Sequence, residues 1–158
     1  MKKFTITAFI VFSFFMFNSI FAGNNSSKVA EEKYDLIVDN YLAGIESNNF
    51  GLKTSSVYYL GELKSSESVI PLLKILRNDD EDIRTRITAA LALYKIGDGR
   101  GIYRLKTMSK FEDNQRLANL SEKFYYSYLL KEMGYEEELN ENSLEEYVQN
   151  TALPNMFN

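Results

Sequence analysis

Basic and aromatic side chains suited to binding recur at helical spacing in the middle of this sequence. Ile70, Lys74 and Arg77 lie four and then three residues apart, which places them on one face of a helix. Their counterparts 33 residues later combine an aromatic, a polar and a basic side chain. Such a strip suits an acidic protein partner, with Tyr103 as its aromatic anchor, and the alternative is an ordinary solvated helix face. The predicted partner-binding residues are Ile70, Lys74, Arg77, Arg100, Tyr103, Thr107 and Lys110.

Residue types needed for most catalysis and metal binding are missing from the sequence. It contains no His and no Cys, which removes the commonest general base, a thiolate nucleophile and Cys-ligated zinc. The acidic run at 78–82 lacks the ligand spacing of a calcium loop, so we interpret it, like Glu136–Glu138, as helix capping and solubility. We therefore expect no enzymatic activity, no cofactor and no metal site.

A second group of candidates is aromatic. Four of five consecutive positions from 124 to 128 are Phe or Tyr, too many to face a single core. We expect most of them to pack in a capping helix, and the alternative is an exposed tyrosine patch suited to a protein interface. The residues concerned are Phe124, Tyr125, Tyr126, Tyr128, Tyr135 and Tyr147.

The first 22 residues have the pattern of a secretory signal peptide. Lys2 and Lys3 precede an apolar run of 14 residues, and Ala22 is the predicted cleavage position. The run is short for a bilayer span, and the alternative is an uncleaved N-terminal anchor. We expect an exported protein, periplasmic or extracellular, without stable membrane anchoring after cleavage.

The charge balance disfavours nucleic acid as a partner. Without Lys2 and Lys3, 16 basic side chains remain against 22 acidic ones, a net charge of −6. General nucleic-acid binding rests on neutralising phosphates with basic side chains. We therefore expect a protein or peptide partner.

Apolar residues recur every three or four positions, which predicts an all-α protein. The expected divisions are a signal peptide (1–22), a polar leader (23–28), a helical domain (29–133) and an acidic linker with a short helix and tail (134–158). The expected core includes Leu60, Leu91, Leu93 and Ile96. Helices are expected at 29–47, 50–63, 69–77, 83–96, 102–110 and 113–133.

Two of these segments repeat each other. Leu60-Gly61-Glu62-Leu63 aligns with Leu93-Tyr94-Lys95-Ile96, a spacing of 33 residues. A period in this range is typical of stacked helical hairpins, in which each hairpin buries its apolar face against the next. The expected fold is therefore an α-solenoid of two clear repeats with capping helices.

Residues 83–102 resemble the HEAT repeat, in the short bacterial type also called PBS-lyase HEAT-like. Arg84 opens the first helix, alanines fill its middle, Gly97-Asp98 closes it, and Ile102 begins the second helix. The resemblance implies a right-handed stack whose second helices line a concave face, with Arg84, Arg86 and Asp98 in an internal polar ladder. It implies a scaffold that binds proteins or peptides. Alternatives from related repeats are a chromophore-linked or small-molecule accessory role, and nucleic-acid binding by concave basic residues.

Overall fold

The described part of this protein, residues 30–135 of a computed structural model, contains helices and turns but no strand. The predicted all-α class is therefore confirmed for these residues. The chain divides into two compact units, residues 1–39 and 40–158. In the first unit, residues 30–39 belong to a helix that continues to residue 44. The predicted signal peptide, the polar leader and the short helix after residue 140 lie outside the described residues.

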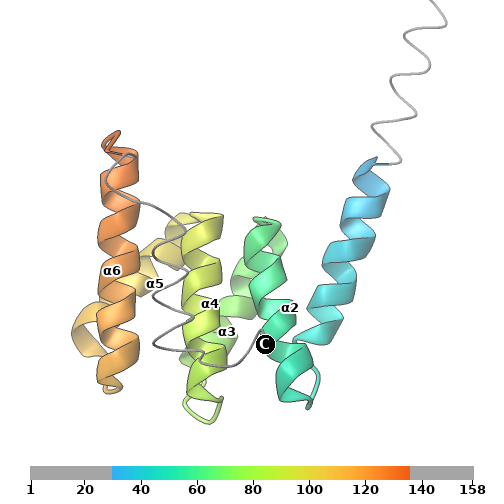
Figure 1. The fold of residues 1–158 in the computed structure, drawn as a ribbon, viewed down its shortest axis with the longest axis horizontal. Coiled ribbons are helices and arrows are strands. Elements are labelled where there is room, and N and C mark those ends of the chain that lie inside the picture. The colour runs from blue at the N-terminus through green and yellow to red at the C-terminus, as the bar shows by residue number, and fades with distance from the viewer. Residues whose placement is uncertain (1–29, 136–158) are drawn as a thin grey trace, which may run out of the picture. The chain divides into compact units, whose positions relative to one another are not determined.

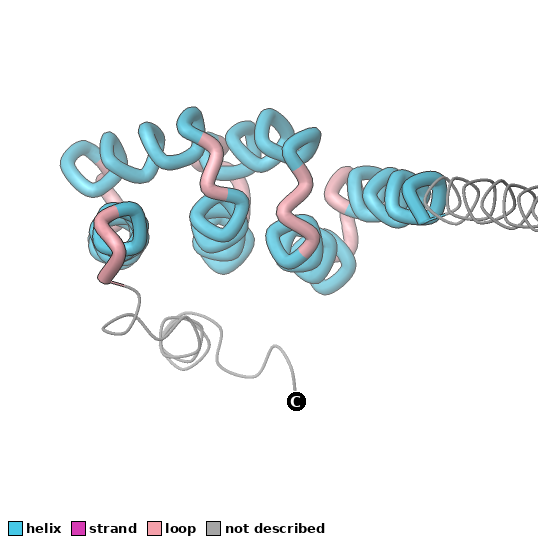
Figure 2. The backbone as a smooth tube through the Cα atoms, turned by 90° about the horizontal axis from the view of Figure 1, so that it is seen from above, coloured by secondary structure: helices cyan, strands magenta, loops and turns pink. Residues whose placement is uncertain are grey.

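The second unit contains five further α-helices among its described residues. Their bounds are α2 (Phe50–Glu62), α3 (Val69–Arg77), α4 (Ile83–Ile96), α5 (Gly99–Phe111) and α6 (Gln115–Glu132), with a short 3₁₀ turn, η1 (Ser66–Ser68), before α3. Helices α2, α4 and α6 stand side by side in one layer, and α3 and α5 form a second layer behind them (Figure 1). Figure 2 shows the first layer end on and the second layer alongside it.

Short polar side chains fix where four of these helices begin. The side chains of Asn49, Asp82, Asp98 and Asn114 accept hydrogen bonds from backbone N–H groups in the first turns of α2, α4, α5 and α6. Such caps satisfy donors that have no partner inside the helix. At the other end of α4, Gly97 adopts a left-handed conformation with φ 72°, which terminates the helix and turns the chain into α5.

Helix α4 forms the centre of the core. It contacts α2, α3, α5 and α6, and every residue from 85 to 94 is buried. A helix enclosed on all sides cannot be amphipathic, which explains the threonines and alanines that fit between its neighbours. Leu60, Leu91 and Leu93 are buried as predicted, whereas Ile96 is only partly buried at the end of α4.

The contact between α2 and α4 is unusually close at one point. A Cβ added to Gly61 would lie 2.7 Å from the Cα of Ala92, so only glycine fits there. Residues one predicted repeat apart also pair along this contact, since Lys95 forms an ion pair with Glu62. Thr54 and Thr85 share a buried hydrogen bond of 2.9 Å. The small residues and matched polar pairs hold α2 and α4 in one register.

Three predicted helix boundaries are wrong by a few residues. The first helix, expected at 29–47, ends at residue 44. Helix α5 begins at Gly99 instead of residue 102, because Asp98 caps it. Gly101 lies inside the helix and packs closely on Leu93: a Cβ added to Gly101 would lie 3.2 Å from the Cβ of Leu93. Helix α6 begins at Gln115 instead of residue 113, because Asn114 caps it and its amide oxygen accepts from Leu117 N. By contrast, the bounds of α3 and α4 match their predictions.

Within residues 30–135, no helix is both long enough and apolar enough to cross a membrane.

Candidate functional site

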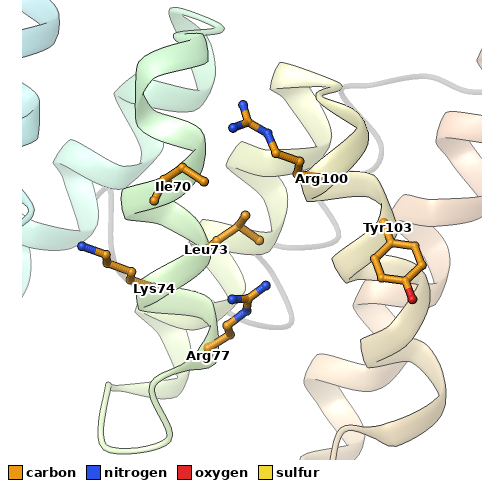
Figure 3. A pocket seen from close by; sticks show the side chains of 6 residues that line it. All are labelled: Ile70, Leu73, Lys74, Arg77, Arg100 and Tyr103. Carbon is orange, nitrogen blue, oxygen red and sulfur yellow. The ribbon is translucent and has the colours of Figure 1, made fainter.

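A groove separates α3 from α5 on the second layer of helices. It has a volume of about 430 Å³. Figure 3 shows Leu73 and the guanidinium groups of Arg77 and Arg100 directed into the space between the two helices. The lining residues are Ile70, Leu73, Lys74 and Arg77 from α3, and Arg100 and Tyr103 from α5.

The α3 wall follows from the apolar spacing of that helix. Four apolar residues of α3 are buried: Val69, Leu72, Leu73 and Leu76. The positions between them face outwards, so Lys74 and Arg77 are exposed and Ile70 remains 47 % exposed. The half-exposed side chain of Ile70 therefore presents apolar surface on the rim of the groove, which a partner can cover.

The α5 wall begins with a capping carboxylate. Asp98 accepts the backbone N–H of Arg100 at 2.9 Å and pairs with its guanidinium through contacts of 2.8 and 3.1 Å. The hydrogen bond from Arg100 lowers the pKa of the Asp98 carboxyl. One turn on, Tyr103 is 68 % exposed. The cap therefore holds the Arg100 guanidinium at the start of α5, and Tyr103, three residues on, lines the same groove.

Five of the seven predicted binding residues line this groove. Thr107 and Lys110 do not line it and lie farther along α5, where the hydroxyl of Thr107 donates to the carbonyl of Arg104 at 2.8 Å. Leu73 also lines the groove, although it is not among the predicted binding residues. Its side chain is 5 % exposed, so it serves both the core and the groove, which apolar spacing alone does not reveal.

Positive charge at the groove is only partly neutralised. Arg100 has Asp98, but no described carboxylate pairs with Lys74 or Arg77, and no acidic residue is among the lining residues. Burial, followed by the nearby charge of Arg77, lowers the pKa of the Arg104 guanidinium. Its Nε is buried without a hydrogen-bond partner in the described structure. The carboxylates of Glu112 and Asp79 act on Arg104 in the opposite direction, so the excess of positive charge is greatest at the groove lining itself, which favours an incoming anion there.

The three residues expected to form a polar ladder play different roles. Arg86 is buried, donates to the carbonyl of Leu76 at 3.2 Å and pairs with Glu112 at 3.1 Å. Arg84 instead pairs with the cap Asp82 at 3.0 Å, as Arg100 does with Asp98. A joint ladder of Arg84, Arg86 and Asp98 is therefore wrong, because both Asp side chains are occupied at their own helix starts.

The acidic run before α4 is used in capping and ion pairs. Asp82 caps α4, and Glu81 pairs with Lys53 at 2.9 Å. Asp79, which is itself exposed, pairs with Arg86 at 3.0 Å. No cluster of three or more carboxylates able to hold a metal ion occurs within residues 30–135.

The aromatic cluster on α6 divides between core and surface. Phe124 is fully buried and stacks on Tyr94 with ring centroids 5.5 Å apart. Tyr125 and Tyr128 are partly buried, whereas Tyr126 and Tyr135 are each 56 % exposed. Tyr147 lies outside the described residues. The aromatics at positions 124–128 therefore serve mainly to pack α6.

Comparison with protein-family models, curated proteins and solved structures finds no match to this chain.

Proposed function

We propose that this protein is an exported scaffold of HEAT-like helical hairpins that binds a protein or peptide in the groove between α3 and α5. The observation that carries the proposal is the pairing of exposed apolar side chains with cations that lack an acidic partner. Ile70 and Tyr103 are 47 % and 68 % exposed beside Lys74 and Arg77. Aromatic residues and arginine are enriched among the energetic hot spots of protein interfaces.

The repeat assignment has its own support. In the proposed solenoid, α2 with α3 and α4 with α5 are successive hairpins, and equivalent positions of neighbouring repeats lie side by side. Glu62 and Lys95, which are 33 residues apart, form an ion pair of this kind. The groove then lies between the second helices of the two hairpins, where one bound segment can touch both.

The lining residues suit binding better than catalysis. They include neither a carboxylate nor an imidazole that could act as a general base. Association with an acidic partner through these cations would be fast at low ionic strength and slower in salt.

A paired-variant capture experiment tests the binding site. Tyr103→Ala with Lys74→Ala is compared with Phe111→Ala and Lys110→Ala, which removes an exposed aromatic and a lysine outside the groove. Using the mature chain as bait in envelope extract, we expect the first pair to weaken retention of a partner by about tenfold or more. The second pair should retain it, and both should melt like the parent. Equal retention by both variants, or loss of stability in the first, would overturn the proposed site.

Export is tested separately. We propose that residues 1–22 direct secretion and are removed after Ala22. N-terminal sequencing of the envelope fraction should then begin at Gly23. An intact Met1 there would contradict cleavage without affecting the binding proposal.

A further inference from the structure

The groove sets clear chemical requirements for whatever occupies it. An occupant should place carboxylates near Lys74 and Arg77, which no described carboxylate neutralises. It should also cover Ile70 and Tyr103 with apolar side chains, because both are substantially exposed. Acidic and apolar residues must therefore alternate closely in the occupant.

One segment of this chain has that composition. Residues 30–135 carry 15 basic and 16 acidic side chains, whereas residues 136–158 carry six acidic side chains and no basic one. The excess negative charge of the protein is thus concentrated after Tyr135. Within this segment, Leu144 and Tyr147 are interleaved with Glu141, Glu145 and Glu146.

The segment follows α6, which packs against α5, one wall of the groove. A Cβ built on Gly97 would lie 3.7 Å from the ring of Tyr128, so the last turns of α6 pack beside the start of α5. Arg100 follows Gly97 by three residues, and the acidic segment follows Tyr128 by eight. The five residues 136–140 alone can extend over about 17 Å. These five residues form the tether between Tyr135, after the end of α6, and residues 141–147.

We propose that residues 141–147 of this chain bind in the α3–α5 groove, with Leu144 against Ile70 and Leu73 and the glutamates near Lys74 and Arg77. The inference rests on the proposed function, because it takes the groove as a peptide-binding site. Since site and ligand share one chain, binding is intramolecular, and effective concentrations for short connections reach the millimolar range. The segment then competes with any external acidic partner for the groove.

A fluorescent reporter tests the proposal in the full chain. The sequence contains no Trp, so Tyr103→Trp places a single reporter on the groove rim. The test variant adds Glu141→Gln, Glu145→Gln and Glu146→Gln. We expect acrylamide to quench the fluorescence of the introduced tryptophan about threefold less in the reporter chain with native glutamates than in the glutamate variant. Such protection corresponds to docking of the segment in about two thirds of the molecules. High salt should remove the difference.

A charge-matched control separates docking from net charge. Glu67→Gln, Asp113→Asn and Glu122→Gln remove three exposed acidic charges at positions that do not line the groove. This control should quench like the parent reporter chain. Equal quenching in the glutamate variant, the control and the parent would overturn the proposal.

A second measurement avoids the tryptophan substitution. Amine labelling of Lys74 should be about threefold slower in the unaltered chain than in the glutamate variant. A synthetic peptide of residues 136–158 should restore slow labelling to that variant, and equal labelling rates would again overturn the proposal. If the capture experiment succeeds while both measurements show no protection, the groove binds an external partner and only this inference fails.

Discussion

Basic side chains on two neighbouring helices, α4 and α3, differ in what neutralises them. Arg86 is 6 % exposed and is bound by the Leu76 carbonyl and the Glu112 carboxylate. Lys74 and Arg77 are exposed on the rim of the groove, without a described carboxylate partner. A buried charge is tolerated only when it is paired, whereas an exposed one is solvated by water. Arg86 is therefore satisfied within the fold, whereas Lys74 and Arg77 are available to a ligand.

The largest expected effect comes from removing the partner of the buried charge. Glu112→Ala leaves Arg86 buried with only the exposed Asp79 as a counterion, and we expect a loss of about 3–5 kcal/mol in the free energy of unfolding. Urea denaturation measures this loss.

Asp79→Ala is the matched control, since its side chain is 88 % exposed, and it should cost less than about 1 kcal/mol. Equal losses in the two variants would mean that the Arg86 pair is not buried in solution.

Leu73 connects the two regions, because it belongs to the core and also lines the groove. Leu73→Ala should cost about 2–5 kcal/mol, the usual range for truncating a buried leucine. Ile70→Ala on the same wall removes a half-exposed side chain and should cost clearly less when both are compared by thermal unfolding. If Ile70→Ala costs as much as Leu73→Ala, Ile70 is part of the core and the groove is shallower than described.

A smaller effect is expected at the cap that orients Arg100. Asp98→Ala should cost about 1 kcal/mol at neutral pH, as other N-cap truncations do. Its pKa in the folded state is lowered by the hydrogen bond from Arg100, so this contribution is present above the unfolded value of 3.8 and is lost as pH falls below it. The stability difference between parent and variant, followed by denaturation from pH 7 to pH 2, should shrink accordingly. A constant difference would show that Asp98 acts by shape alone.

The smallest effect on stability is expected in the groove itself. Lys74→Ala with Arg77→Ala should change the free energy of unfolding by less than about 0.5 kcal/mol, because both side chains are exposed and unpaired among the described residues. Chemical denaturation at low and high salt checks this. A clear stabilisation at low salt would instead indicate that these cations repel each other and Arg104.

Local signals explain which helices the sequence predicts well. Pro71 requires a place in the first turn of α3, and Gly97 ends α4 with a positive φ, so both helices match their predicted bounds. The start of α5 is harder to predict, because Gly99 and Gly101 resemble a break. Gly101 is helical since it packs closely against Leu93, a contact between helices that no local pattern encodes.

The residues of the site also differ in whether local sequence patterns predict them. The exposed side of α3 follows from four-residue and three-residue spacing, so Ile70, Lys74 and Arg77 were predictable. Pairing Arg86 with Glu112 was not, because the two residues are 26 positions apart and lie on α4 and just beyond the end of α5. A ligand can use only the charged side chains that no other residue neutralises. Tertiary contacts decide which side chains these are.

The glycine contact between α2 and α4 has a mechanical consequence. Gly61 faces the backbone of Ala92, which cannot rotate aside as a side chain can. The Glu62–Lys95 ion pair and the Thr54–Thr85 hydrogen bond join the same two helices at other points. These contacts hold α2 and α4 together along their length. If the two hairpins bend relative to each other, the α2–α4 contact is the hinge and α3 and α5 move farthest. Such bending would therefore change mainly the width of the groove.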